Sequence, residues 1–125
     1  MAAMRTLRIT VYVASPYTIG DPAVNVRNSL LAADELASIG FLPFAPLLSH
    51  FWHFMSPHPY EFWTAMDLAW VLRSDAVLRL PGTSAGADAE VKIAEEHGIP
   101  VFCDIKSLNV YFSNTQEPNA TSRDA

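Results

Sequence analysis

The feature that most constrains the fold is a regular alternation of strand-like and helix-like segments along the chain. This alternation is typical of a parallel β-sheet with helices on both faces, because each parallel strand needs a crossover connection to the next. We therefore predict an α/β doubly wound parallel sheet of four to five strands. The predicted strands are residues 7–14, 41–45, 76–80 and 99–104, and helices are predicted after the first strand, from residue 59 or 60 to residue 73, and over residues 87–97.

The first helix carries clear start and stop signals. Asp21 is suited to cap a helix N-terminus, and Pro22 follows at the first helical position. Apolar residues then recur at helical spacing from Val26 and Leu30 onward. Gly40 supplies the stop, so a helix is predicted between Pro22 and Gly40.

Length and composition are those of one domain. The chain has 125 residues, of which 50% are hydrophobic and 17% charged, and this is enough for one core. We assign residues 1–112 to a single domain, in which residues 110–112 could add a fifth strand. Residues 113–125 are polar, and we predict that they form a loose C-terminal tail.

Charge and cysteine content limit the partners. The formal net charge is −5 and no run of Lys or Arg occurs, so the composition argues against nucleic acid and against a polybasic membrane surface. The single cysteine, Cys103, is predicted to be a buried strand thiol in a reducing compartment. No apolar stretch of about 18 residues and no signal-peptide pattern occurs, so we expect a cytoplasmic protein without a membrane partner.

Residues 76–90 place a strand, a turn of small residues and a helix start in direct succession. Thr83 and Ser84 offer hydroxyl and backbone N–H groups at a helix N-terminus, a position that favours anions. Gly86 lets a ligand approach the backbone closely, and Glu90 follows about one turn into the helix, near where a bound sugar could sit. The alternative is an ordinary Ser-capped helix whose Glu90 complements the helix dipole.

Four short motifs follow one another in an informative order. They are residues 11–17 (VYVASPY), Asp67 on a helix followed by residues 74–76 (SDA), residues 81–86 (PGTSAG) leading to Glu90, and residues 98–101 (GIPV). Together they resemble the nucleoside 2-deoxyribosyltransferase-like superfamily, over about residues 7–104. That superfamily includes transferases that exchange bases between deoxynucleosides and hydrolases that cleave the N-glycosidic bond of nucleoside 5′-monophosphates. The resemblance implies a flavodoxin-like (Rossmann-like) fold with its ligand crevice at the carboxyl ends of the strands.

The resemblance implies catalytic roles for three residues. Glu90 matches the nucleophilic glutamate of the family, which attacks the anomeric carbon to give a glycosyl-enzyme intermediate. Asp67 matches the helical aspartate near the nucleophile and the base, and the hydroxyl of Tyr12 can orient the glutamate. A carboxylate on one side and a proton source near the leaving base are the minimum equipment for an oxocarbenium-like transition state. Asp67 could instead hydrogen-bond a backbone turn, and Tyr12 could be a packed strand residue.

The resemblance also implies substrate-binding segments. The turn after the first strand corresponds to the loop that lines the sugar, and the spacing of the small-residue turn before Glu90 resembles the hydrolases that hold a 5′-phosphate there. The first loop, residues 15–21, lacks the arginine and extra glycines of those hydrolases, which leaves Arg27 as the nearest basic candidate and leaves both nucleotide and nucleoside open. The candidates in these segments are Ala14, Ser15, Pro16, Arg27, Thr83, Ser84 and Gly86.

Residues 48–63 are rich in aromatic side chains and in histidine. This segment could stack on a nucleobase or lie in a subunit interface, and in the resembled family both occur together. His50, His53 and His58 fit no tight zinc spacing, so no metal is predicted. His50 or His58 could protonate a leaving base. His50 and Trp63 complete the candidate substrate-binding residues.

These inferences combine into one expected function. We expect an N-glycosidase or base-exchanging transferase that acts on a nucleotide or nucleoside without cofactor or metal, as a homo-oligomer (dimer or tetramer). One alternative is a non-catalytic nucleotide-sensing module that kept the pocket. A second alternative is a structural oligomer built on the aromatic segment.

Overall fold

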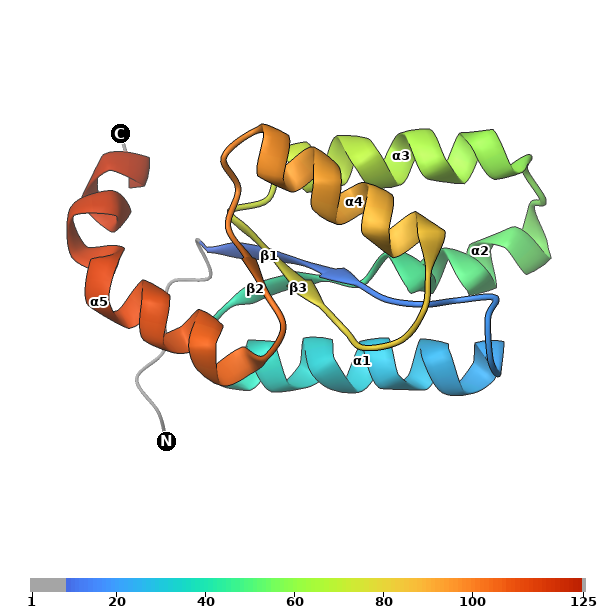
Figure 1. Ribbon diagram of the computed structural model, residues 1–125, viewed down its shortest axis with the longest axis horizontal. Helices are drawn as coiled ribbons and strands as arrows, with labels where there is room; N and C mark the ends of the chain where they lie inside the picture. The colour runs from blue at the N-terminus through green and yellow to red at the C-terminus, as the bar shows by residue number, and fades with distance from the viewer. Residues whose placement is uncertain (1–8, 125) are drawn as a thin grey trace.

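The computed structural model describes residues 9–124, with side chains through residue 114. One parallel sheet in the order β2-β1-β3-β4 lies between helices on both faces (Figure 1). The strands are β1 (Thr10–Ala14), β2 (Leu42–Phe44), β3 (Ala76–Arg79) and β4 (Val101–Phe102). The helices are α1 (Pro22–Ser38), η1 (Pro46–Leu48, a 3₁₀ turn), α2 (Ser49–Met55), α3 (Tyr60–Leu72), α4 (Ala85–Glu96) and α5 (Ile105–Asp124).

The strand order confirms the predicted doubly wound parallel sheet and is that of a flavodoxin-like fold. The chain passes from β1 to β2 at one edge and then crosses to β3 on the other side of β1. The connections therefore diverge between β1 and β3. Ligand crevices of open α/β sheets lie outside the carboxyl ends of the strands at such a point, which here means the segments after Ala14 and Arg79.

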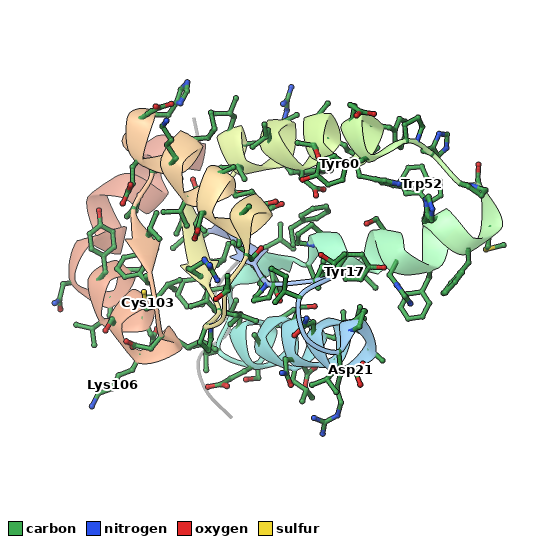
Figure 2. The ribbon with its side chains drawn as sticks, turned by 45° about the vertical axis from the view of Figure 1, so that its right-hand side comes forward. Tyr17, Asp21, Trp52, Tyr60, Cys103 and Lys106 are labelled. Carbon is green, nitrogen blue, oxygen red and sulfur yellow. The ribbon has the colours of Figure 1, made fainter. Side chains whose placement is uncertain are left out.

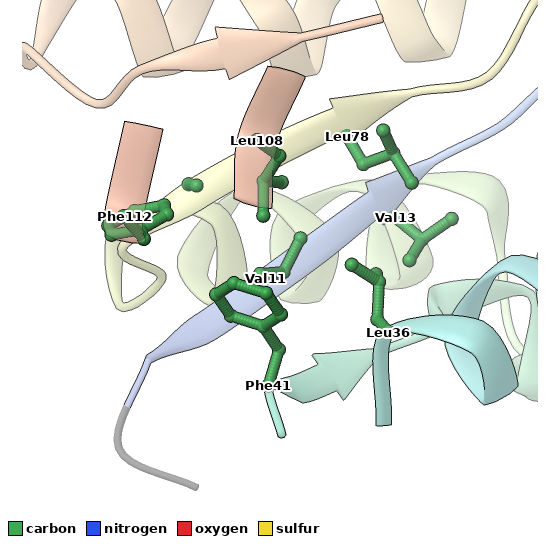
Figure 3. Packing of buried hydrophobic residues seen from close by; sticks show 8 residues of the cluster. Val11, Val13, Leu36, Phe41, Leu78, Leu108 and Phe112 are labelled. Atoms are coloured by element: carbon green, nitrogen blue, oxygen red, sulfur yellow. The ribbon is translucent and has the colours of Figure 1, made fainter. Parts of the chain in front are cut away.

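Alternating side chains of β1 divide the core into two clusters. On one face, Val11 and Val13 pack with Leu36 of α1 and Leu108 of α5 (Figure 3). On the other face, Tyr12 packs with residues of α3 and α4. Successive residues of a strand point to opposite faces of the sheet. The valine–tyrosine–valine pattern thus directs Tyr12 toward α4.

The start and end of α1 are as predicted. The side chain of Asp21 accepts hydrogen bonds from two backbone N–H groups of the first turn, at 2.9 and 3.4 Å, and Pro22 is the first helical residue. Gly40 follows the helix with a φ of 94°, a conformation that residues with a Cβ rarely adopt. The cap at Asp21 therefore fixes where the loop between β1 and α1 ends.

The prediction for the C-terminal part was wrong. Residues 110–112 form no fifth strand, and residues 113–124 continue a helix rather than a loose tail, because both segments belong to α5. Residue 125 lies outside the described residues.

The physical reason lies in the cap and the spacing of α5. The carboxylate of Asp104 accepts hydrogen bonds from the backbone N–H of Ser107 at 2.7 Å and from its hydroxyl at 3.1 Å, as in an N-terminal helix cap. Leu108 and Phe112 are four residues apart and both are buried in the same cluster. That spacing puts two side chains on one face of a helix.

Two further predictions need correction. Cys103 is exposed rather than buried, because β4 lies at the edge of the sheet and ends at Phe102, one residue earlier. Residues 46–55 form η1 and α2, for which no helix was predicted. Aromatic residues and histidine are only moderate helix formers, so the composition of this segment does not predict a helix.

Candidate active site

A cavity of about 620 Å³ lies beyond the carboxyl ends of β1 and β3, within the size range of small-molecule sites. The loop after β1, the helices α2 and α3, and the turn into α4 form its walls. Tyr17 from that loop and Tyr60 at the start of α3 both line it, on two sides in the view of Figure 2. The predicted site residues that line this cavity are Ser15, His50, Trp63, Asp67, Thr83, Ser84, Gly86 and Glu90.

The other four predicted site residues do not line the cavity. Tyr12 is fully buried behind it, and Ala14 is fully buried in the core. Pro16 is buried beneath Gly82, where an added Cβ would come within 2.9 Å of the proline ring. Arg27 is exposed on α1. Ala14 and Pro16 therefore lie behind the cavity wall, and Arg27 lies outside the cavity.

Tyr12 and Glu90 form the central contact of the site. The Tyr12 hydroxyl donates a hydrogen bond of 2.7 Å to Oε2 of Glu90 across 78 positions of the sequence. Burial raises the pKa of Tyr12 far above its usual value, and the negative charges of Glu90 and Asp67 raise it further. The phenol therefore remains a neutral donor, and it holds one oxygen of Glu90 in place.

Asp67 and Glu90 share the cavity, and the pKa of each is raised. Burial raises the pKa of Asp67 to about 7. The pKa of Glu90 is also raised, to about 7, and burial is the largest cause. The hydrogen bond from Tyr12 and the charge of Arg79 oppose this rise, whereas the charge of Asp67 adds to it. Two carboxyl groups that interact in this way titrate as a pair. Near neutral pH the pair therefore holds about one proton.

The surroundings of the two carboxyl groups differ, although the pKa of each is raised to about 7. Glu90 has a hydroxyl donor and a nearby guanidinium, both of which favour its ionised form. Asp67 makes no hydrogen bond with any residue that the structure describes, and burial alone accounts for its raised pKa. Its carboxyl group faces the cavity instead of holding a backbone turn. The arrangement is a pair of carboxyl groups with raised pKa values, of which Glu90 is held by the hydroxyl of Tyr12.

The raised pKa of Asp67 has a measurable consequence for stability. An aspartate that ionises near pH 4 when unfolded and near pH 7 when folded destabilises the fold progressively across that window. Asp67→Asn cannot ionise. We therefore expect the free energy of unfolding of the variant, relative to the wild type, to rise between pH 5 and pH 8 by about 1 kcal/mol after solvent screening. Urea titrations at several pH values measure this, and a pH-independent difference would contradict the raised pKa.

Arg79 does not line the cavity but stabilises the turn beside it, and it was not among the predicted site residues. Its guanidinium donates hydrogen bonds to the carbonyl oxygens of Leu80 and Gly82, the latter at 3.0 Å, and forms an ion pair with Asp88 at 2.9 Å. These contacts fix the turn between β3 and α4. An arginine near the end of a predicted strand, two residues before a Pro–Gly turn, was the available sequence signal.

The turn into α4 offers free hydrogen-bond donors to the cavity. Ser84 caps the helix by accepting a hydrogen bond from the N–H of Ala87 at 3.0 Å. Within residues 9–124, the N–H groups of Ala85 and Gly86 have no acceptor, as is usual for a first helical turn. A Cβ added at Gly86 would meet only the Ser84 hydroxyl, at an ordinary distance of 3.9 Å. Packing within the chain therefore does not require glycine at this position.

Aromatic and histidine side chains form the opposite wall. His53 accepts hydrogen bonds at Nδ1 from Nε1 of Trp63 at 3.0 Å and from the N–H of His58 at 3.2 Å. A neutral His53 therefore carries its proton on Nε2. The Tyr17 hydroxyl and Nδ1 of His50 lie 2.5 Å apart, which joins the first loop to α2. These contacts line this side of the cavity with aromatic and imidazole rings.

Metal ligands and membrane spans are not found in the described part of the chain. No group of three or more His, Cys, Asp or Glu residues within residues 9–124 could hold a metal ion. No helix in that range combines the length and the apolar character that a membrane span needs.

Comparisons with known proteins add no family assignment. The sequence matches no family model, and a search among curated proteins gave no match. The functional argument therefore depends on the geometry of the cavity.

Proposed function

We propose that this protein cleaves the N-glycosidic bond of a (deoxy)nucleoside or a nucleoside 5′-monophosphate, with Glu90 as the nucleophile. The observation that carries the proposal is the pairing in one cavity of two carboxyl groups with raised pKa values, Glu90, which is held by Tyr12, and Asp67, to which the proposal assigns the shared proton. Two carboxyl groups with different roles are the equipment of retaining glycosidases. The motif resemblance supports the same chemistry.

In the first step, the Glu90 carboxylate attacks the anomeric carbon of the sugar. A carbon–oxygen bond forms while the bond from carbon to the base nitrogen breaks, and its electron pair passes to the base. Asp67 supplies a proton to the departing base, which avoids the release of an unstable anion. The Tyr12 hydroxyl bonds one Glu90 oxygen and leaves the other for the attack.

In the second step, the ester between Glu90 and the sugar is broken. Water attacks the anomeric carbon, Asp67 takes up the proton of the water, and the Glu90 carboxylate is released. If a second base arrives in place of water, its nitrogen attacks the anomeric carbon, Asp67 takes up the proton of that nitrogen, the Glu90 carboxylate is released and a new nucleoside forms. Hydrolysis and base transfer therefore share one intermediate and differ only in the acceptor.

The two walls of the cavity suit the two ends of such a substrate. The aromatic side around Trp63 offers rings for stacking on a base. The turn at Ser84 and Gly86 offers a hydroxyl and free N–H groups to the sugar or to a 5′-phosphate. The residues that line the cavity include no lysine or arginine. Because no cationic side chain lines the cavity to bind a phosphate, the proposal includes both nucleosides and nucleotides as substrates.

Gly86→Ala distinguishes these two substrates. The added methyl group fits the chain, so we expect an unchanged or slightly higher melting temperature, since alanine is the better helix former. If a phosphate lies against the turn, the methyl group should raise KM for a monophosphate by about 10-fold, equivalent to one charge-assisted hydrogen bond. KM for the matching nucleoside should barely change. Equal changes for both substrates would exclude a phosphate at this turn.

The cellular setting and the assembly complete the proposal. The exposed free thiol of Cys103 and the acidic composition support a cytoplasmic protein. The exposed aromatic residues of α2 support a homo-oligomer, dimer or tetramer.

The direct test is a panel of nucleosides and 5′-monophosphates incubated with the protein, with and without a second base. We expect free base from at least one substrate, and a new nucleoside if transfer occurs. Binding without release of base would favour the sensing module instead.

A further inference from the structure

The histidines that line the cavity, His50, His53 and His58, differ in the hydrogen-bond partners of their rings. Nδ1 of His50 lies against the hydroxyl of Tyr17. Nε2 of His58 lies 3.3 Å from the hydroxyl of Ser56. A hydroxyl group can donate or accept a hydrogen bond, so both contacts are compatible with either neutral tautomer of the ring. These two histidines can therefore present a donor or an acceptor to a ligand.

His53 differs because both of its partners are N–H groups. Its Nδ1 lies 3.0 Å from Nε1 of Trp63 and 3.2 Å from the backbone nitrogen of His58. An N–H group can only donate, so Nδ1 is the unprotonated nitrogen of the neutral ring and Nε2 carries the proton. Among the residues whose side chains the structure describes, Nε2 has no acceptor. His53 is thus an uncommitted hydrogen-bond donor of fixed polarity on a ring that lines the cavity.

This donor lies about one helical turn from Asp67. The residues of α3 that line the cavity have the spacing of one helix face: Tyr60, Trp63, Thr64, Asp67 and Leu68. Trp63, which bonds His53, precedes Asp67 by four residues, equivalent to about 6 Å along the helix axis. A base whose sugar-linked ring lies near Asp67 and extends along α3 would bring its far edge toward Trp63 and His53.

We propose that the Nε2–H group of His53 binds the edge of the base remote from the sugar, and that the site selects bases with a carbonyl oxygen at that edge, as in uracil or hypoxanthine. This inference rests on the proposed function and deepens it. Cytosine and adenine present an amino group at the same position, and two donors cannot form a hydrogen bond. The donor also favours departure of the base. Part of the electron pair that the base receives spreads to the carbonyl oxygen, where His53 stabilises the charge.

Matched substrates test this selection: uridine with cytidine and inosine with adenosine, with ribose or deoxyribose, and with or without a 5′-phosphate. We expect the wild type to favour the oxo member of each pair in binding and in kcat/KM. His53→Phe keeps a ring but has no donor. It should lower the oxo-to-amino ratio of kcat/KM by about 10-fold, the effect of one hydrogen bond that strengthens as charge develops. Comparing this ratio between two proteins removes the intrinsic difference in reactivity of the bases.

Two control variants separate the donor from the packing of the wall. Trp63→Phe removes the indole N–H group but keeps a ring, and the backbone N–H of His58 still bonds Nδ1 of His53. His58→Phe makes the same substitution in a neighbouring histidine of the cavity and leaves that backbone N–H in place. Both variants should keep the oxo-to-amino ratio of the wild type. Circular dichroism checks that each variant is folded.

Three outcomes would overturn the proposal. They are an unchanged ratio in His53→Phe, a fall of the same size in His58→Phe, or a proton on Nδ1 of His53, which nitrogen NMR of the imidazole detects without any ligand.

Calorimetric titration of the same compounds into Glu90→Gln separates this inference from the proposed function. Selective binding of the oxo members that the further change His53→Phe abolishes, without base release by the wild type, would support the donor and contradict the glycosidase. Base release that is equally selective with and without His53 would do the reverse. If none of the compounds binds or releases its base, both are contradicted.

Discussion

Glu90→Gln is expected to lower the rate of base release by about 10⁴-fold or more, because an amide oxygen cannot form the covalent intermediate. Glutamine retains the size of glutamate and can still accept the hydrogen bond from Tyr12. The binding of substrate should therefore change little, and the loss should appear in kcat. Single-turnover release of free base, followed by chromatography, measures the effect.

The fold of this variant provides the control. Burial penalises the charge of Glu90, so the neutral glutamine should preserve or increase the melting temperature at pH 8. Glu95→Gln on the exposed side of the same helix removes an equal charge outside the cavity and should keep full activity. Base release by Glu90→Gln at a rate near that of the wild type would exclude Glu90 as the nucleophile.

Asp67→Asn should lower kcat/KM by about 10²–10⁴-fold, the usual contribution of a positioned general acid. Asparagine has almost the same shape but cannot supply the proton that the departing base needs. If kcat/KM falls by less than about threefold while the melting temperature stays normal, Asp67 is not the general acid and its role is structural.

The dependence of kcat/KM on pH separates the roles of the two carboxyl groups. As the pH falls below about 7, Glu90 takes up a proton and ceases to be a nucleophile. As the pH rises above about 7, Asp67 loses its proton and ceases to be an acid. We expect a narrow bell-shaped profile with its maximum near neutral pH. The residual activity of Asp67→Asn should keep the acidic limb and lose the alkaline limb, which a merely structural role for Asp67 would not produce.

Local patterns were sufficient to predict much of the fold. The cap at Asp21 and the glycine at position 40 bound α1 through backbone requirements that depend on a few neighbouring residues. The alternation of Val11, Tyr12 and Val13 assigns each side chain to a face of the sheet. The prediction that Tyr12 orients Glu90 came from the motif resemblance, and the hydrogen bond between them agrees with it.

Features that depend on tertiary contacts could not be predicted. Pro16 looked like a substrate contact because it adjoins the first loop, but its position is decided by its packing against Gly82, far away in the sequence. Arg27 was chosen for its charge, yet the orientation of α1 leaves it exposed. The contacts of Arg79 with Gly82 and Asp88 depend on how the turn between β3 and α4 folds back on the strand, which local patterns do not predict.

The most direct test of the proposed mechanism is to trap the covalent intermediate and locate it. A nucleoside with fluorine at the 2-position of its sugar destabilises the oxocarbenium-like transition state and slows the breakdown of the glycosyl ester. We predict that the wild-type chain gains the mass of the sugar, that peptide mapping assigns it to Glu90, and that Glu90→Gln gains none. A sugar attached to Asp67, or base release by the wild type with no sugar on any residue, would contradict the account.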